Sequence, residues 1–387
     1  MLIALYWLLL ALIAYSLFGY GLIWMALAAL FGQTRSATPR DAPALHATML
    51  IAARNEAAAI RAKLQTVLMQ TCGPHKVDIL VVSDGSEDNT LSEALVLADP
   101  RVAAFQTEGH VGKAAALNAG LARIGAPDVV IFSDANSLLA MDALGYLLAP
   151  FSDPRVGGVC GRPEPIWRKG GWLARVERLF WAYDSGLKRA ESALGGAVSA
   201  QGTLYAIRRE LLPDEVPSTM ADDFYISAQV PAQGKRLIFE PRAIAQEEVT
   251  VRVGEEFMRR VRSTERGWRA LMQMARLMNP AQHGVYAVQL ASHKGLRRLV
   301  AFLLPLLLLV NIAIAAQNWF FAITLSLQLA FYLFAVCAIF SPRVRAWPGG
   351  GLAAFFVLGH LAMGYGILRA AFGVRSARWS PVRGVPE

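Results

Sequence analysis

The segment VVIFSDANSLLA (129–140) places a carboxylate and an amide two residues apart, directly after an apolar run. The two residues are Asp134 and Asn136. Two oxygen ligands with this spacing at the end of a strand can hold one hard cation, such as Mg²⁺ or Mn²⁺. Asp and Asn are also common turn residues, so the segment alone fits a simple turn equally well. The other polar clusters of the chain decide between these two interpretations.

Two further apolar runs end in polar clusters of the same kind. AARNE closes one run with Arg54, Asn55 and Glu56, and SDGSEDNT begins at Asp84 after the other. Each cluster by itself also fits a turn or a helix cap. Three such clusters at one edge of a sheet are more than turns require, and ligands bind beyond the carboxyl ends of parallel strands. The pattern therefore predicts a binding site at that edge.

A fourth polar segment, EGHVGKAAALNAG (108–120), joins a glycine and a lysine to the start of a helical pattern. Gly112 permits a close approach of the backbone, and Lys113 puts a cation near a helix N-terminus, where phosphate is favoured. The spacing of a Walker phosphate loop is missing. Alone, the segment favours a solvated lysine at the start of a helix.

Adjacent carboxylates, Asp222 and Asp223, occur in the segment MADDFYIS. Like charges side by side raise the pKa of one of the pair, which suits a general base. A helix N-cap is the structural alternative, and the two roles are compatible. Farther on, residues 255–271 predict an amphipathic helix with a dense basic face, which suits a phosphate or an anionic lipid surface.

Alternating strands and helices are the elements that would position these residues. Apolar runs predict strands at 47–53, 77–84, 101–107 and 128–134, and helical periodicity predicts helices at 56–70, 90–98 and 113–124. Strict alternation, with strands that are apolar throughout, predicts an α/β fold with a mostly parallel sheet covered by helices.

Four apolar segments predict membrane spans. Hydrophobic residues make up 55% of the 387 residues and charged residues only 17%, which is too apolar for a soluble enzyme. At about 1.5 Å per residue, the first segment can span a hydrocarbon core of about 30 Å even when it is tilted. The segments are Leu2–Leu30, Leu299–Ala316, Phe320–Phe340 and Gly351–Phe372.

The charge pattern predicts the orientation of the chain. Arg35 and Arg40 follow the first span, so the positive-inside rule places the next domain in the cytoplasm. By parity the C-terminal tail would lie outside, although it is basic, which conflicts with the same rule. The predicted organisation is a span at 1–31, a polar domain at 44–295 with halves 44–140 and 141–295, three spans at 296–373 and a basic tail at 374–387.

The net charge of +9 is gathered in arginine clusters, which suit anionic lipid headgroups or a phosphorylated substrate. No basic stripe with interleaved aromatics and no nucleic-acid-binding motif occurs, so we expect no nucleic-acid partner. The three cysteines, Cys72, Cys160 and Cys337, show no spacing typical of a disulfide framework or a zinc site.

Seven motifs resemble, in the same order, those of membrane-anchored family 2 glycosyltransferases of the GT-A fold. That group includes chitin-oligosaccharide, hyaluronan, cellulose and poly-N-acetylglucosamine synthases, and the resemblance covers Met49 to Arg276. It implies a Rossmann-like GT-A domain on the cytoplasmic side of a bacterial-type inner membrane. It also implies an inverting, metal-dependent transferase that uses a nucleotide sugar, usually a UDP-sugar. The motifs are LIAARNE, VVSDGSEDNT, GKAAALNAG, FSDANS, AQGTLYAIRRE, ADDFYIS and RRVRSTERGW.

The resemblance implies a role for individual residues of these motifs. On the donor side, Ala53 and Glu56 would line the nucleoside, Asp84 would face the uracil, and Lys113 would lie near the base or the phosphates. Asp134 and Asn136 match the Asp-x-Asp motif that holds magnesium or manganese on the diphosphate. That cation neutralises charge on the departing diphosphate.

Further roles concern the acceptor and the reaction. Asp223 would be the catalytic base beside Asp222. Gln201 and Gly202 would border the sugar site on the acceptor side, and Arg262 would bind the diphosphate.

The chain departs from the family pattern at three positions. Arg259 stands where the family has a Gln. Asn136 stands where the family has a second Asp, so the motif carries one charge less. Ser263 stands where the family has a Trp that supports the acceptor sugar, and Trp268 lies five residues later. The acceptor therefore remains open between a growing glycan and a polyprenyl phosphate or other membrane lipid. A third possibility is a non-catalytic membrane subunit that binds a nucleotide sugar.

Overall fold

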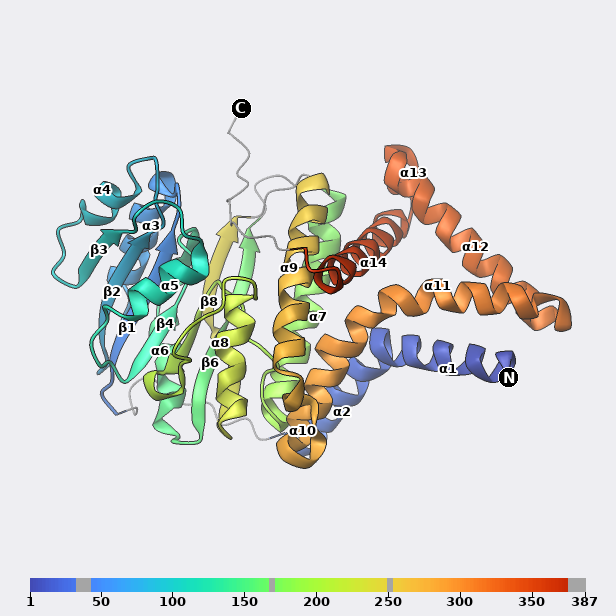
Figure 1. Ribbon diagram of the computed structural model, residues 1–387, viewed down its shortest axis with the longest axis horizontal. Helices are drawn as coiled ribbons and strands as arrows, with labels where there is room; N and C mark the ends of the chain where they lie inside the picture. The colour runs from blue at the N-terminus through green and yellow to red at the C-terminus, as the bar shows by residue number, and fades with distance from the viewer. Residues whose placement is uncertain (33–42, 167–170, 249–252, 375–387) are drawn as a thin grey trace.

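The computed structural model describes residues 1–32, 43–166, 171–248 and 253–374 of the chain. Figure 1 shows an α/β domain beside a group of long helices that extend away from it. Arg35, Arg40 and the tail after Val374, on which the predicted orientation depends, lie outside the described residues.

One mixed sheet of eight strands forms the centre of the α/β domain, in the order β3-β2-β1-β4-β7-β6-β8-β5. β1 pairs in parallel with β2 and β4, and β2 pairs in parallel with β3. β7 runs antiparallel between β4 and β6, β6 and β8 are parallel, and β5 is antiparallel to β8. The strands are β1 (His46–Ala53), β2 (Lys76–Ser83), β3 (Val102–Gln106), β4 (Val129–Phe132), β5 (Ser137–Leu139), β6 (Val156–Ile166), β7 (Tyr205–Arg208) and β8 (Arg236–Glu248).

Both faces of the sheet are covered, which explains why its central strands are apolar throughout. Successive side chains of a strand point to opposite faces. On β1, Met49 and Ile51 join a core with α3, α4 and α6, while Leu50 and Ala52 join another with α5 and α8. The helices of this domain are α3 (Ala57–Leu68), α4 (Thr90–Leu95), α5 (Lys113–Leu121), α6 (Ala143–Leu148) and α8 (Asp222–Ala232).

The predicted elements of residues 44–140 are confirmed to within a few residues at each end. The predicted helix at 56–70 is α3, Ala57–Leu68, and the predicted strand at 128–134 is β4, Val129–Phe132. The sheet is parallel from β3 to β4, and the antiparallel pairings all involve strands after β4. The prediction of a mostly parallel sheet therefore describes the first half well, and the second half makes the sheet mixed.

Four helices are long and apolar enough to cross a membrane within the described ranges, at Leu2–Phe31, Pro280–Gln317, Trp319–Phe340 and Gly350–Ala371. They agree with the four predicted spans, except that the second begins well before Leu299. It passes through a π-helical segment, Ala291–Leu296, on its way into the apolar part. The predicted boundary at residue 295 thus falls inside one helix. The α-helices of the apolar part of the molecule are α1 (Leu2–Ala14), α2 (Tyr20–Phe31), α10 (Pro280–Leu290), α11 (Arg297–Ile314), α12 (Trp319–Phe340), α13 (Pro342–Arg345) and α14 (Gly350–Ala371).

Two long amphipathic helices, α7 (Trp172–Leu194) and α9 (Val253–Gln273), lie between the sheet and the apolar helices (Figure 1). α7 packs against α2 through Leu187 and Tyr20. α9 packs against α8 and α10 in a core that contains Phe224 and Leu271. The packing holds the basic helix α9 beside the N-terminus of α8, where the paired carboxylates lie.

Candidate active site

The polar clusters that follow β1, β2 and β4 meet at one edge of the sheet. β1 and β2 are in register from His46–Lys76 to Ala53–Ser83, so they end side by side. β4 pairs with β1 up to Leu50–Phe132. Because parallel strands share their carboxyl edge, the Asp-Ala-Asn turn lies beside the end of β1.

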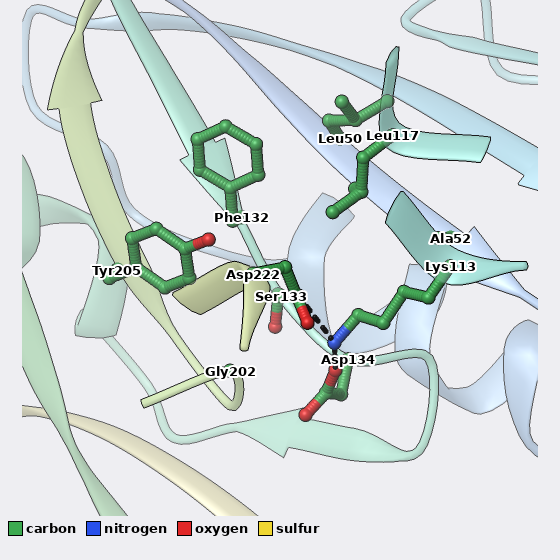
Figure 2. Close-up of a pocket in the computed structure, with 10 residues that line it drawn as sticks. All are labelled: Leu50, Ala52, Lys113, Leu117, Phe132, Ser133, Asp134, Gly202, Tyr205 and Asp222. Atoms are coloured by element: carbon green, nitrogen blue, oxygen red, sulfur yellow. Dashed lines mark hydrogen bonds and ion pairs between the residues drawn. The ribbon is translucent and has the colours of Figure 1, made fainter. Parts of the chain in front are cut away.

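Lys113 joins two of the predicted motifs. Its ammonium Nζ lies 2.7 Å from Asp134 Oδ1 and 3.2 Å from Asp222 Oδ2 (Figure 2). Burial alone would lower the pKa of Lys113, but the two carboxylates outweigh it and raise this pKa. The lysine therefore stays charged and holds the Asp-Ala-Asn turn and the start of α8 at one cleft.

The Asp-Ala-Asn turn rests on a buried lysine that the sequence analysis missed. Lys63 of α3 donates from Nζ to Ser133 Oγ and to the carbonyl of Ser137, both at 2.6 Å. Ser133 and Ser137 also donate to the carbonyl of Thr203, at 2.5 and 3.0 Å. Burial lowers the pKa of Lys63 to about 7. The network ties the turn to the segment that carries Gln201 and Gly202.

The donor atoms of the turn fit a divalent cation. One oxygen of Asp134, Oδ1, binds Lys113, while Oδ2 accepts no hydrogen bond from a described residue. A Cβ at Gly202 would lie 3.0 Å from Oδ2, so the glycine keeps this oxygen open. Asn136 donates through Nδ2 to Glu247 Oε1 at 3.1 Å. Its carbonyl Oδ1 has no hydrogen bond in the described chain, which leaves an oxygen of the type that Mg²⁺ and Mn²⁺ prefer.

No cluster of three or more His, Cys, Asp or Glu residues that could hold a metal occurs among the described residues. A cation at this edge would therefore be held by few protein groups. This is usual for cations that bind phosphate, since such cations take most of their ligands from the substrate and water.

The paired carboxylates begin α8, at the N-terminal end where negative charge is favoured. Burial would raise the pKa of Asp222, but Lys113 and Arg266 hold it below its usual value. Burial and the neighbouring charge of Asp222 raise the pKa of Asp223. Asp223 Oδ1 accepts from the backbone N–H of Phe224 at 2.7 Å, and Oδ2 has no hydrogen bond from a described residue. The two environments separate an ionised carboxylate from one suited to exchange a proton.

α9 holds the loop that leads into these carboxylates. Arg266 donates from Nε to the carbonyl of Met220 at 3.0 Å and from Nη2 to that of Ser218 at 3.3 Å. Arg262 lies one helical turn earlier on the same helix, so the two share a face. Arg262 is half-buried and has no hydrogen bond or ion pair with another described residue. Its contact with a phosphate stays a prediction, while Arg266 has a structural role that the sequence did not reveal.

The residues predicted to line the nucleoside surround the ends of β1 and β2. Ala53 ends β1 and accepts from the backbone N–H of Asp84 at 2.8 Å. Glu56 is buried, and its own N–H donates to Thr90 Oγ1 at 2.8 Å. The carboxylate of Asp84 is 1% exposed and accepts from the N–H of Val111 at 2.7 Å. Asp84 therefore holds the loop before α5 in place, and a contact with a base stays a prediction.

The residues predicted for the acceptor side lie across the cleft. Gly202 is adjacent to Asp134, and the buried Oε1 of Gln201 has no hydrogen-bond partner among the described residues. Tyr205 stacks on Phe132 with ring centroids 4.9 Å apart, and its buried hydroxyl has no partner in the described part of the chain either. Figure 2 shows Tyr205, Lys113, Asp134 and Asp222 around a cavity of about 10 Å³. That volume holds about one water, so a substrate would lie on the open side of the carboxylates.

The sequence analysis missed Lys63 and Glu247, because neither residue lies in a recognised motif. Lys63 lies on the buried side of α3, in the apolar stripe with Ile60, Leu64 and Val67. A charge within such a stripe is a signal that sequence alone could have offered. Glu247 offers no such signal, because it reaches Asn136 only through the pairing of β5 with β8.

Comparison with known proteins identifies the domain that carries this cleft. Residues 48–214 match the model of Glycosyl transferase family 2. Over these residues the chain is similar to glycosyl transferase family 2 domains. The matched segment contains the motifs of Ala53, Asp84, Lys113, Asp134 and Gln201. It ends before α8, and the roles of all these residues, like those of Asp222, Asp223 and Arg262, stay predictions.

Two curated relatives of the family 2 domain act in glycan synthesis according to their names. A poly-beta-1,6-N-acetyl-D-glucosamine synthase of Staphylococcus aureus is 27% identical over 232 residues, which is 58% of this chain and 55% of the relative. An N-acetylglucosaminyltransferase of Bradyrhizobium diazoefficiens is 26% identical over 185 residues, 44% of this chain and 38% of that protein. The chain thus spans about half, or less, of the length of the relatives it matches.

A solved structure shares the fold over nearly the whole chain. The mannosyltransferase PcManGT from Pyrobaculum calidifontis, in complex with GDP-Man and Mn2+, has a TM-score of 0.71 at 22% identity. The superposition covers 96% of this chain and 100% of that one. The GT-A fold predicted from the sequence motifs is confirmed.

Proposed function

We propose that this protein is an inverting glycosyltransferase that moves a sugar from a nucleotide sugar, a UDP-sugar, to a growing polysaccharide or oligosaccharide. The observation that carries the proposal is the double contact of Lys113 with Asp134 and Asp222. It brings the turn suited to a diphosphate and its cation to the same cleft as the carboxylate suited to be a base. Neither group alone would transfer a sugar.

The reaction follows from the positions of these groups. Asp223 takes the proton of the acceptor hydroxyl, whose oxygen forms a bond to the anomeric carbon. The bond from that carbon to the diphosphate oxygen breaks, and attack from the opposite side inverts the configuration. The cationic groups Lys113 and Arg262 stabilise the negative charge that develops on the leaving diphosphate. A cation held by Asp134 and Asn136 supplies Lewis-acid neutralisation of the same charge.

The comparisons support the proposed substrates. Both curated relatives are named for N-acetylglucosamine transfer or polymerisation. The solved structure with the same fold holds a nucleotide sugar, GDP-Man, and Mn2+. A nucleotide sugar and a divalent cation, Mg²⁺ or Mn²⁺, are therefore the expected ligands of the cleft. The four apolar helices support a multi-pass membrane protein. We propose that it lies in a bacterial inner membrane, with the α/β domain in the cytoplasm.

Turnover of a panel of donors tests the proposal. Purified full-length protein, with Mn²⁺ and membrane lipid, is incubated separately with UDP-glucose, UDP-N-acetylglucosamine and GDP-mannose, and nucleotide release is measured. We expect release from one UDP-sugar and a glycan ladder with the same radiolabelled donor. If no donor releases nucleotide, with or without lipid, the enzyme proposal fails.

A lipid acceptor is the second candidate, and a hollow beside α14 favours it. The hollow has a volume of about 410 Å³ and is lined in part by Met220, Trp268, Met272 and Ala370. Met220 is two residues before Asp222, so the hollow adjoins the start of α8 and an apolar helix at once. Transfer of one sugar to a polyprenyl phosphate predicts a single lipid-extractable radiolabelled product in place of a ladder.

A further inference from the structure

Asn136 and Glu247 meet although they are far apart in the sequence. β5 pairs antiparallel with β8, with Ser137 opposite Glu247. This register puts Asn136, the residue before β5, next to the Glu247 side chain. Asn136 Nδ2 donates to Glu247 Oε1 at 3.1 Å. The contact lies two residues from Asp134 along the chain, at the turn that fits a cation.

The contact decides which end of the amide faces the cleft. A carboxamide has a donor end and an acceptor end, whereas an ionised carboxylate only accepts. Glu247 therefore attracts the Nδ2 end of Asn136 and repels the Oδ1 end. Oδ1 is left without a hydrogen bond from any described residue. Because hard cations bind oxygen and not amide nitrogen, this is the end that a cation requires.

Glu247 also changes the charge of the turn. A turn with Asp134 and Asn136 carries one negative charge. Burial and the neighbouring Asp134 raise the pKa of Glu247, while Asn136 and Arg259 favour its ionised form, and as a carboxylate it adds a second charge. Positive groups surround the three side chains: Lys113 binds Asp134, and Arg259 of α9 bears on Glu247 electrostatically. The replaced aspartate of the motif is thus compensated from another strand.

We propose that Glu247 is the positioning residue of the Asp134–Asn136 cation site: it orients the Asn136 amide so that Oδ1 faces the cation, and it supplies the charge that the amide lacks. The inference rests on the proposed function, in which this turn holds the cation of a nucleotide-sugar diphosphate. Glu247 acts through Asn136 and needs no bond to the cation.

Mn²⁺ binding to the full-length protein in detergent tests this role without turnover. Electron paramagnetic resonance counts the free Mn²⁺ in the presence of UDP. Glu247→Ala removes both the acceptor and the charge, so we expect Mn²⁺ affinity to fall by about 10- to 100-fold, as for other partners of metal ligands. Glu247→Gln keeps an acceptor for Nδ2 but loses the charge, and we expect a smaller loss.

Exchanging the carboxylate and the amide between positions 136 and 247 separates a positioning role of Glu247 from a general loss of protein stability. Asn136→Asp alone places two carboxylates in contact, so we expect little gain in Mn²⁺ affinity. The double variant Asn136→Asp with Glu247→Gln restores one donor and one acceptor, and we expect its affinity to exceed that of Glu247→Gln. Glu248→Gln is the matched control, since Glu248 is the exposed neighbour on the same strand, and we expect wild-type affinity.

The outcomes distinguish this inference from the proposed function. Wild-type protein that binds Mn²⁺ while Glu247→Ala binds it equally well would overturn the inference alone, as would a double variant no better than Glu247→Gln. Wild-type protein that binds neither Mn²⁺ nor UDP would overturn both. Thermal melting of every variant shows whether a loss of affinity is a loss of folding.

Discussion

At the scale of single residues, the cleft depends on one lysine shared by two carboxylates. Lys113 is bound to Asp134 and to Asp222, so Asp222 is ionised and paired. Asp223, its neighbour, has only a backbone donor on one oxygen. The same two-residue motif thus contains one carboxylate committed to structure and one free to accept a proton. This asymmetry supports the prediction that Asp223 is the base.

Asp223→Asn should abolish sugar transfer while donor binding persists. The amide keeps the shape of the side chain but cannot take the acceptor proton, and loss of a general base costs about 10²- to 10⁴-fold in rate. The measurement is turnover of the donor found active, beside binding of UDP to the same variant. Unchanged transfer by Asp223→Asn would show that another group is the base, and unchanged glycan output in cells would favour a non-catalytic subunit.

The acidic limb of the activity profile should lie above the usual range for an aspartate. Asp223 must be deprotonated to act, and its folded pKa is raised by burial and by Asp222. Activity should therefore fall as the pH drops through a value higher than the usual Asp pKa of about 3.9. Initial rates across pH at saturating Mn²⁺ measure this. A limb at or below the ordinary value would contradict the assignment.

At the scale of elements, α3 and α9 support the cleft from opposite sides. α3 places Lys63 beneath the Asp-Ala-Asn turn, and α9 places Arg266 on the loop before α8. Arg262 shares the face of Arg266 but has no partner among the described residues. Removal of Arg266, which holds the loop, and removal of Arg262, which has no described partner, should therefore have different consequences.

Arg262→Ala should weaken the transfer step more than it weakens folding. Loss of a guanidinium that stabilises developing phosphate charge costs about 10- to 10³-fold in kcat/KM. Arg276→Ala is the matched control, because Arg276 is exposed near the C-terminal end of the same region, and it should behave like the wild type. Equal kinetics for both variants would remove Arg262 from the site.

Lys63 should make the stability of the protein depend on pH. Its pKa is about 7 in the folded protein, against about 10.4 for an exposed lysine. Between these values the unfolded chain binds the proton and the folded chain does not, so the free energy of unfolding rises with pH by up to about 1.4 kcal/mol per pH unit from this group.

Thermal melting in detergent at pH 7 and pH 9 tests this sign. The gain in apparent Tm at pH 9 should be smaller in Lys63→Met than in the wild type, because the variant has no proton to lose at that position. Lys235→Met is the control, since Lys235 is a partly exposed lysine of the same domain whose Nζ donates to the carbonyl of Pro154 at the surface. An equal gain in Lys63→Met and the wild type would refute the depressed pKa.

At the scale of the whole molecule, the sheet and the apolar helices are joined through α7, α9 and the long helix that begins at Pro280. Cores between α2 and α7, and among α8, α9 and α10, connect the two parts. The paired carboxylates of α8 thus lie close to the helices that can enter a membrane, which suits an acceptor delivered from the lipid phase or exported through it.

The protein should behave as an integral membrane protein. Four apolar helices, each longer than the about 20 residues that a bilayer requires, give insertion that charge screening cannot reverse. After expression in bacteria, the chain should stay in the membrane pellet through alkaline carbonate and high salt, and detergent should release it. Release by carbonate alone would mean that the helices lie on the membrane and do not span it.

The sequence alone was enough to predict the elements of the first half of the sheet and the four apolar helices. The strands β1 to β4, the helices between them and the four apolar helices follow from local periodicity, because burial on two faces or in lipid imposes its pattern residue by residue. The motifs at the carboxyl edge could be recognised for the same reason. The altered Asp-x-Asn turn could also be recognised from the sequence, because Asn136 carries one negative charge less than the Asp of the family motif.

Only the tertiary structure decided which distant side chains complete the cleft. Lys113 reaches Asp222, Lys63 reaches Ser133, and Asn136 reaches Glu247 across 111 residues of chain. These contacts depend on the antiparallel second half of the sheet and on the packing of α8 and α9. Strand pairing between distant segments leaves no periodic pattern in either segment, because the partner is chosen by the fold and not by its neighbours in the chain.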